Sequence, residues 1–403
     1  MRVLFLTLRL PGQLMRGDQL RASQHIRLLS QRHRITLLVF DSATPDAAAL
    51  ADMQACCEQV IVIRRSVPGM AARLLGALFS SRPLQVSMFD SAALRAAITR
   101  LCAASNFDLA HVQLARLGPM LEPLAGLPCV LDFVDALSLN MRRRAALDRG
   151  PLRFVVAAEA VRLARYERAL CAQASAVVVC SAQDRAAIGS FPNLHLVRNG
   201  VDLARFPWRD PGDRGDGIVF IGNLGYFPNI DAATWFADEV MPLLCARRAT
   251  VHLQLVGARP APALRRRVAQ WPNVELIGEV PDVHPWLARA AVAVVPLRSG
   301  SGQQLKMLEA MSAGTPVVAT SLSAAGLDVV DGEHLLIADD SLSMAAAVMR
   351  LLTDPQLALR LATAARALVE RAYSWQCSAA ELEAQWLQAA RSEATTAPAI
   401  RLR

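Results

Sequence analysis

Short apolar runs alternate with longer amphipathic stretches along the whole chain, which predicts strands and helices in turn. Such alternation is typical of parallel α/β folds, whose strands are buried on both faces. We expect strands at Val3–Leu8, Ile35–Phe40, Val60–Ile63, Leu109–Val112, Cys129–Phe133, Ala176–Cys180, Gly217–Ile221, Val251–Val256, Val274–Ile277, Val292–Val295, Pro316–Ala319 and Leu335–Ile337. The main helices are expected at Asp18–Arg32, Ala92–Ala103, Leu152–Ala172, Asp231–Leu244, Ala263–Gln270 and Gln303–Ser312.

The 403 residues exceed what one hydrophobic core usually holds, so two doubly wound domains are expected. Segment 206–216 is rich in Pro, Gly and Asp and is predicted to be a hinge-like linker between them. Ligands of such sheets bind beyond the carboxyl ends of the strands. The loops expected to face a common ligand cleft are therefore those after Leu8, Phe133, Ile221, Ile277 and Pro296.

The composition argues against several classes of protein. The chain is 53% hydrophobic, yet it contains no apolar run of about 18 residues that would predict a membrane-spanning helix. The run Val3–Leu8 is too short for a signal-peptide core, so we interpret it as the first strand. The eight cysteines show no C-x-x-C spacing, which argues against a zinc site or a disulfide framework and favours a reducing cytoplasm.

The positive charge is concentrated in the first half of the chain. Residues 1–205 contain 25 arginines against 15 acidic residues, so this half is expected to face an anionic partner. An anionic membrane surface or a lipid-phosphate acceptor fits better than nucleic acid, because aromatic and basic residues are not interleaved. The helix expected at Leu152–Ala172 carries Arg153, Arg162, Arg165 and Arg168 along an apolar stripe and could lie on a membrane. The alternative is an ordinary solvated surface rich in arginine.

The chain's single lysine, Lys306, stands in a setting that suits phosphate. A buried-type strand runs into a Gly-Ser-Gly turn, and a helix is expected to begin near Gln303. Helix N-termini expose unpaired N–H groups, and an ammonium group one turn into the helix adds a compact positive charge. The alternative interpretation is a surface lysine on an ordinary helix.

Several short motifs carry a resemblance to a known family. The strongest segment, Arg298–Thr320, contains Arg298, Gly300, Gly302, Gln304, Lys306, Leu308-Glu309-Ala310-Met311, Gly314 and Pro316-Val317-Val318. The others are Phe220-Ile221-Gly222-Asn223 with Pro228-Asn229, Gly278 to Val283, Arg198 to Asp202, Arg16-Gly17-Asp18 with Arg21, and Asp132-Phe133-Val134-Asp135. Together they resemble retaining glycosyltransferases of family 4, which have the GT-B fold, and are most similar to a bacterial subgroup associated with exopolysaccharide assembly.

The resemblance covers nearly the whole chain and implies two Rossmann-like domains facing across a cleft. It implies an acceptor-side domain at 1–205, a linker at 206–216 and a nucleotide-sugar-binding domain at 217–372. We further expect a C-terminal helix at 373–390 that packs back on the N-terminal domain, and a flexible tail at 391–403.

On the donor side, the resemblance places the diphosphate of a nucleotide sugar at Arg298 and Lys306. Backbone N–H groups around Gly302 and Gln303 would complete the site, with Gln304 beside them. Gly222 and Asn223 would let the first loop of the second domain approach the phosphates. Glu309 would bind the ribose hydroxyls, although its alternative is an ion pair with Lys306. Glu279 and Val280 would hold the base, and Asp282 is interpreted mainly as a helix N-cap. No metal and no further cofactor is expected, since no Asp-x-Asp cluster stands out.

On the acceptor side, Gly12 and Gly17 would let a loop cover the donor phosphate or the acceptor. Arg16 and Arg21 are candidates for an anionic acceptor, the alternative being solvated arginines. Asp135 is expected to contact the donor sugar or to orient the acceptor hydroxyl. Residues expected to be structural are Asp132, which would satisfy loop amides, His111, as a packed or cleft-lining histidine, and Asn199 and Asp202, which would turn the chain.

One departure from the family pattern concerns a pair of glutamates that many members carry. Glu309 is the second of them, but Ser301 occupies the first position, which leaves the donor sugar obscure. The resemblance implies a metal-independent transferase that moves a sugar from a nucleoside diphosphate to a glycan or lipid-linked acceptor. It would act in the cytoplasm, at the inner face of the membrane if peripherally attached. The alternatives are a sugar-nucleotide epimerase and a degenerate transferase that serves as a binding subunit.

Overall fold

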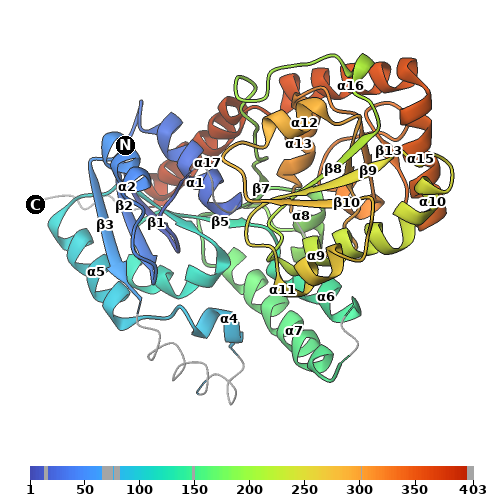
Figure 1. The fold of residues 1–403 in the computed structure, drawn as a ribbon. Coiled ribbons are helices and arrows are strands. Elements are labelled where there is room, and N and C mark those ends of the chain that lie inside the picture. The colour runs from blue at the N-terminus through green and yellow to red at the C-terminus, as the bar shows by residue number, and fades with distance from the viewer. Residues whose placement is uncertain (13–16, 66–75, 77–81, 148–149, 301, 397–403) are drawn as a thin grey trace, which may run out of the picture. The chain divides into compact units, whose positions relative to one another are not determined.

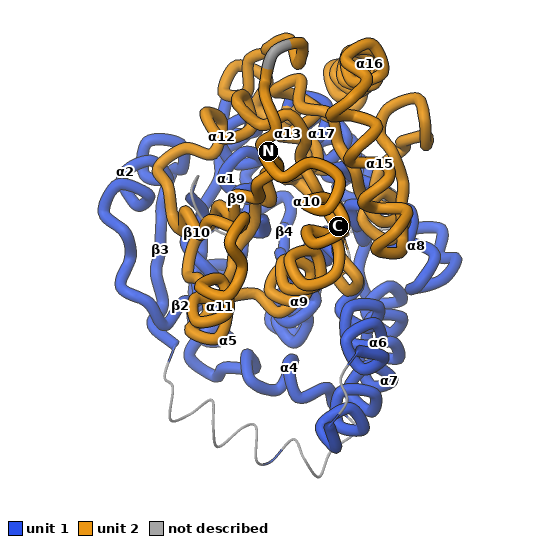
Figure 2. The backbone as a smooth tube through the Cα atoms, turned by 45° about the vertical axis from the view of Figure 1, so that its right-hand side comes forward, with its two compact units in different colours: residues 1–198, 376–403 blue, residues 199–375 orange. Residues whose placement is uncertain are grey.

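A computed structural model of the chain describes residues 1–12, 17–65, 76, 82–147, 150–300 and 302–396 (Figure 1). The chain divides into two compact units, which Figure 2 distinguishes by colour. Unit 1 comprises Met1–Arg198 and Gln376–Arg403, and unit 2 comprises Asn199–Trp375. Each unit is built around one parallel sheet.

Unit 1 holds a seven-stranded sheet with the order β3-β2-β1-β4-β5-β6-β7, in which every neighbouring pair is parallel. This is the order of a Rossmann-like sheet extended by one strand. Each of the six predicted strands appears within one residue of its expected ends, and Leu194–Leu196 was missed because it is so short. The strands are β1 (Arg2–Thr7), β2 (Arg34–Asp41), β3 (Gln59–Arg64), β4 (Leu109–Gln113), β5 (Cys129–Val134), β6 (Ala176–Val179) and β7 (Leu194–Leu196).

Helices cover both faces of this sheet, and each face has its own apolar core. The helix α17 (Trp375–Thr396) belongs to unit 1 although it closes the chain. Its Leu382 and Trp386 are fully buried in one cluster with Val3 and Phe5 of β1, because a helix with an apolar stripe must bury it against a partner. The other helical elements are α1 (Gly17–Leu29), α2 (Ala47–Cys56), α4 (Leu84–Ser87), α5 (Ala92–Ala104), the 3₁₀ segment Ala115–Leu124, α6 (Leu137–Leu147), α7 (Leu152–Cys171) and α8 (Ala182–Ile188).

Unit 2 repeats the same plan with six strands in the order β10-β9-β8-β11-β12-β13, again with parallel neighbours. All six were predicted. The strands are β8 (Gly217–Ile221), β9 (His252–Val256), β10 (Val274–Gly278), β11 (Val292–Val295), β12 (Val317–Ala319) and β13 (Leu336–Ile337). The helices are α9 (Phe227–Trp235), α10 (Met241–Cys245), α11 (Pro262–Val268), α12 (His284–Arg289), α13 (Leu305–Ser312), α14 (Ser321–Ala324), α15 (Ser341–Thr353) and α16 (Pro355–Ala372). A π-helical turn, Phe236–Val240, joins α9 to α10.

The predicted hinge-like linker at 206–216 is wrong. The boundary lies at Arg198 and Asn199, and the segment is packed onto unit 2. Phe206 is 3% exposed within the core of that unit, and its carbonyl accepts hydrogen bonds from Ser312 and Arg366. Its Pro, Gly and Asp residues shape turns, but the buried Phe206 fixes the segment in place.

The predicted flexible tail at 391–403 is also partly wrong, because α17 continues to Thr396. The remaining residues, 397–403, lie outside the described part of the chain.

Candidate active site

In unit 2, the end of β10 and the loop that follows β11 contain glycines with unusual backbone geometry. Gly278, Gly300 and Gly302 have φ values of +79°, +115° and +74°, which disfavour any residue with a side chain. These glycines let the chain leave the carboxyl edge of the parallel sheet abruptly. This edge is where such sheets bind ligands.

Lys306 lies on the first turn of α13, which begins at Leu305 with Gln304 as its N-cap. The helix therefore starts two residues later than the sequence predicted, because Gly302 bends the loop until that point. The Nζ atom of Lys306 donates a hydrogen bond of 2.5 Å to Oδ1 of Asn229 and lies 5.0 Å from the centre of the Phe220 ring. Lys306 is half-buried, so the interpretation as an ordinary surface lysine is wrong.

Gly222 provides the space in which this contact forms. A Cβ atom at position 222 would lie 2.9 Å from the Asn229 side chain and 3.0 Å from Nζ of Lys306. Asn229 in turn donates to the carbonyl oxygen of Asn223 at 3.0 Å. The structure thus brings together three predicted donor-side residues, Gly222, Asn223 and Lys306. It adds Asn229, which the sequence marked only as part of a motif.

Burial sets the charge state of the two ionisable groups on α13. It lowers the pKa of Lys306 to about 7, against the opposing effect of Glu309. Burial also raises the pKa of Glu309 to about 7, which Arg205 and Lys306 oppose. Glu309 thus senses the charges of Arg205, Lys306 and Asp282, but the ion pair with Lys306 expected as its alternative role is not found among the described residues. Two groups that titrate near neutrality on one helix are a frequent mark of a functional site.

Helix α9, whose Asn229 contacts Lys306, also holds the side chain of Arg298. Its guanidinium group makes a bidentate ion pair with Asp231 of α9, at 3.0 Å from Nε and 2.6 Å from Nη2. The side chain also lies over the Trp235 ring, 5.6 Å from its centre, and remains 37% exposed. The first turns of α9 therefore supply one partner to each cation, Asn229 to Lys306 and Asp231 to Arg298. The pair with Asp231 engages the edge of the guanidinium group formed by Nε and Nη2.

The loop between β11 and α13 contains a polar group that sequence reasoning missed. The hydroxyl of Ser299 is fully buried and has no hydrogen-bond partner among the described residues. Buried hydroxyls are normally paired, and an unpaired one beside glycines suits a ligand oxygen. Its position directly before the Gly-Ser-Gly turn was the only sequence signal. Ser301, the departure from the family pattern, lies outside the described residues.

The side chain of Gln303 has a structural contact, while the donor contact expected of its backbone N–H stays a prediction. Its side-chain oxygen accepts the backbone N–H of Asn199 at 2.6 Å, and the residue is only 9% exposed. The amide thus fixes the start of unit 2. Gln304 helps to begin helix α13 through its backbone, because its carbonyl oxygen accepts the N–H of Met307 at 2.9 Å.

In the loop after β10, Glu279 is exposed and Val280 is half-buried, which leaves both accessible beside Gly278. The carboxylate of Asp282 accepts the N–H of His284 at 3.2 Å, as expected of a capping aspartate, although the N-cap position itself is Val283. Asp202 likewise turns the chain by accepting the N–H groups of Ala204 and Arg205.

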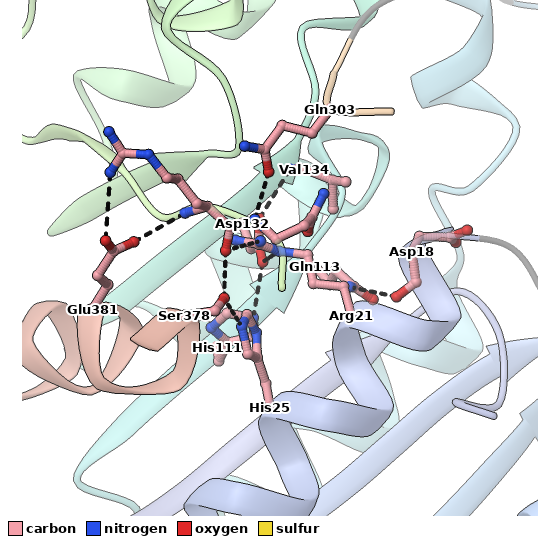
Figure 3. Close-up of polar contacts among 12 residues, drawn as sticks. Asp18, Arg21, His25, His111, Gln113, Asp132, Val134, Gln303, Ser378 and Glu381 are labelled. Atoms are coloured by element: carbon pink, nitrogen blue, oxygen red, sulfur yellow. Dashed lines mark hydrogen bonds and ion pairs between the residues drawn. The ribbon is translucent and has the colours of Figure 1, made fainter. Parts of the chain in front are cut away.

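In unit 1, Arg21 and Asp132 form a buried ion pair (Figure 3). Nε of Arg21 lies 2.7 Å from Oδ2 of Asp132, and both side chains are 0% exposed. Arg21 also donates to the carbonyl of Arg198 at 3.3 Å. The structure therefore contradicts both interpretations of Arg21, as an acceptor-binding residue and as a solvated arginine. The reason is that α1 presents its inner face to β5, where a buried carboxylate requires a cation.

Asp132 also shapes the backbone that leads to Asp135. Its Oδ1 atom accepts the N–H of Val134 at 2.9 Å, which confirms the predicted structural role. Val134 has a φ of +65°, a strained value for a β-branched residue, at a register shift between β5 and β6. This turn places the half-buried Asp135 directly beyond the carboxyl end of β5. The Arg21–Asp132 pair thus supports the position of the predicted catalytic carboxylate.

His111 is fully buried, as the packing interpretation predicted. Its Nδ1 atom accepts a hydrogen bond from Nε1 of Trp386 at 3.1 Å, and burial lowers its pKa to about 4. Such a histidine stays neutral at physiological pH. In the loop before α1, Gly12 is buried and Gly17 opens the helix, whereas Arg16 lies outside the described residues.

Within the described part of the chain, no group of three or more His, Cys, Asp or Glu side chains is arranged to hold a metal ion. Among the described helices, none combines the length and the apolar character needed to cross a membrane.

Comparison with known proteins identifies the class of unit 2. The model of the family Glycosyl transferases group 1 matches residues 215–354. Unit 2 is a glycosyltransferase group 1 domain. This domain contains the Gly222 loop and all of α13. The phosphatidyl-myo-inositol mannosyltransferase of Mycolicibacterium smegmatis is 32% identical over 195 residues, which are 46% of this chain and 50% of that protein. The chain thus spans about half the length of the first curated relatives that it matches.

Solved structures extend the likeness of the fold to both units. Sucrose-phosphate synthase from Thermosynechococcus elongatus matches 97% of this chain and 99% of its own, with a TM-score of 0.71 and 17% identity. Anabaena HepE, solved in complex with UDP and glucose, matches 98% of this chain and 100% of its own, with a TM-score of 0.66 and 17% identity. The chain therefore has the two Rossmann-like domains of the GT-B fold, as predicted.

Proposed function

We propose that this protein is a retaining glycosyltransferase of family 4. It moves a sugar from a nucleoside-diphosphate sugar to the hydroxyl of a glycan or lipid-linked acceptor in bacterial polysaccharide biosynthesis. The observation that carries the proposal is the half-buried Lys306, held against the Gly222 loop inside a glycosyltransferase group 1 domain.

The donor diphosphate lies at the head of α13 in this proposal. Lys306 and Arg298 neutralise its charge, and the Ser299 hydroxyl donates to a phosphate oxygen. Each charge-assisted hydrogen bond contributes about 1.5–3 kcal/mol, with more where charge develops in the transition state. The Glu309 carboxylate binds the ribose hydroxyls. Glu279 and Val280 border the base.

The reaction exchanges one bond at the anomeric carbon for another on the same face of the sugar. The bond from that carbon to the phosphate oxygen breaks as the bond to the acceptor oxygen forms. The acceptor proton passes to the departing phosphate, so no separate base is needed. Asp135 orients the acceptor hydroxyl or the donor sugar. All charge neutralisation in this scheme comes from side chains and the helix end.

The acceptor is proposed to be lipid-linked, at the inner face of the cytoplasmic membrane. Two observations support this choice. The arginine excess of residues 1–205 suits an anionic surface. One relative is named for mannosyl transfer to phosphatidyl-myo-inositol.

A nucleotide screen tests the proposal directly. Thermal unfolding is followed with the diphosphates of uridine, guanosine and adenosine and with their sugars, because a bound ligand raises the melting temperature by mass action. The ligand that stabilises the protein is then incubated with it, with and without a membrane lipid extract. Transfer to the extract supports a transferase. An epimerised nucleotide sugar without acceptor would identify an epimerase, and no binding at millimolar ligand would leave a non-catalytic subunit.

A further inference from the structure

The helices α6 and α7 of unit 1 form a hairpin whose outer end is unusually apolar. The two helices pack side by side along their length, and Figure 1 shows them as an antiparallel pair. At the start of α7, Leu152 is 70% exposed, Phe154 65% and Val155 51%. Val161, two turns further, is 53% exposed. A single exposed apolar residue is ordinary, whereas exposed apolar residues that share one side of a helix indicate a binding surface.

Two of the exposed apolar residues project from one side of α7. Phe154 and Val161 are seven residues apart, so they project from the same side of α7. The opposite side carries the buried stripe Ala160, Leu163 and Leu170, which anchors the helix to the unit 1 core. Phe154 and Val161 therefore face away from the protein on a firmly packed helix.

Among the described residues of α6 and α7, the exposed charged side chains are all positive. The two acids of α7 are buried and used inside the protein: Glu159 accepts the N–H groups of Leu84 and Gln85, and Glu167 accepts the N–H of Ser138. α6 carries no acid in its sequence. The arginines that accompany the apolar residues are Arg142 and Arg144 on α6 and Arg153, Arg162 and Arg165 on α7.

We infer that the α6–α7 hairpin docks on an anionic phospholipid bilayer. The apolar side chains of Phe154 and Val161 enter the boundary between headgroups and acyl chains. The arginines lie at the level of the lipid phosphates, their aliphatic stems against the apolar layer. The cationic side chains of the two described helices favour this occupant, because two copies of the same surface would repel each other. The inference deepens the proposed function by naming the surface that brings the enzyme to a lipid-linked acceptor.

Flotation with lipid vesicles tests the inference on the full chain. Vesicles of phosphatidylcholine alone are compared with vesicles that contain phosphatidylglycerol as well. We expect binding only to the anionic vesicles and a loss of binding as salt is raised. Arg162→Gln with Arg165→Gln is expected to weaken binding about thirtyfold, from ~1 kcal/mol for each arginine near the surface.

The apolar contribution is tested by Phe154→Ser with Val161→Ser. The matched control is Leu342→Ser, which removes an equally exposed leucine (66%) from α15 of unit 2. We expect the double variant to lose vesicle binding while the control keeps it. Circular dichroism and nucleotide binding verify that the double variant is folded.

Three results would overturn the inference: no binding of the wild-type chain to anionic vesicles, unchanged binding of the double variant, or self-association that the double variant abolishes. The last would assign the surface to a second copy. These results are separable from the proposed function, since vesicle binding requires no nucleotide and donor binding requires no vesicle.

Discussion

Nζ of Lys306 lies 2.5 Å from Oδ1 of Asn229, and the absence of a side chain at Gly222 leaves room for that contact. The three residues come from α13, α9 and the loop after β8. The three residues depend on one another, because a side chain at position 222 would collide with both Asn229 and Lys306.

Replacement of Gly222 by alanine is expected to displace the lysine. The added Cβ would lie 2.9 Å from Asn229 and 3.0 Å from Nζ, so one of the two side chains must move. We expect the affinity for the preferred nucleoside diphosphate to fall about tenfold or more, from the loss of a charge-assisted hydrogen bond. Isothermal titration calorimetry measures the change. Gly217→Ala, at the other end of β8, is the control, since its Cβ meets only the His252 side chain, at 3.3 Å.

The affinity for a nucleotide sugar is expected to fall as pH rises above about 7. The free ammonium of Lys306 has a pKa of about 7, and a bound diphosphate raises that pKa because it stabilises the cation. Binding then takes up a proton, and the affinity falls by up to about tenfold per pH unit above the free pKa. Calorimetry in buffers of different ionisation enthalpy detects the proton uptake. The slope should persist in Glu309→Gln and vanish in Lys306→Gln.

Arg298 is expected to exchange Asp231 for the donor. An ion pair this exposed contributes about 0–1 kcal/mol, so removal of the competing carboxylate raises donor affinity by up to about fivefold. Asp231→Ala tests this in the same binding assay, and Arg298→Met should lower the affinity. If the two substitutions lower affinity equally, Arg298 acts by holding α9 and does not contact the diphosphate.

Loss of either partner of the Arg21–Asp132 pair is expected to destabilise unit 1. Both side chains are 0% exposed, and a buried charge left without its partner costs about 3–5 kcal/mol. Urea unfolding of Asp132→Asn and Arg21→Met measures the free energy of unfolding. Arg27→Met is the control: its pair with Asp52 is exposed, so the expected loss is below about 1 kcal/mol.

Asp135 is expected to act on turnover and not on diphosphate binding. Asp135→Asn should lower the transfer rate about tenfold to a hundredfold, from the loss of one charge-assisted hydrogen bond to the sugar or acceptor. The affinity for the nucleoside diphosphate alone should stay unchanged. Asp108→Asn, at the start of β4, is the control. A variant with full turnover would remove Asp135 from the proposed mechanism.

The sequence predicted the strands well because their signal is local. β8 and β11 were placed at their observed ends, since an apolar run bounded by glycine or proline needs no distant partner to be recognised. Helix ends were less certain. α13 starts two residues late because the left-handed turn at Gly302 delays it, and the helix predicted at Asp231–Leu244 is interrupted by a π-helical turn.

The candidate site was predicted only in part, because motifs are local but contacts between side chains are not. Lys306 and Gly222 could be named from motifs, but their partners could not. Arg298 meets Asp231 across 67 residues of sequence, Lys306 meets Asn229 across 77, and Arg21 meets Asp132 across 111. No periodicity relates such positions. The role of Arg21 was wrong because an arginine on an amphipathic helix looks solvated until its buried partner is known.

By itself, the sequence determined that this protein is a pair of parallel α/β units with a cationic, glycine-rich loop in the second. Those features follow from the period of apolar residues and from local backbone freedom. The tertiary structure alone decided which charges are buried, which are shared and which remain for a ligand. Desolvation and long-range pairing set these properties, and both depend on which strands and helices the fold brings together.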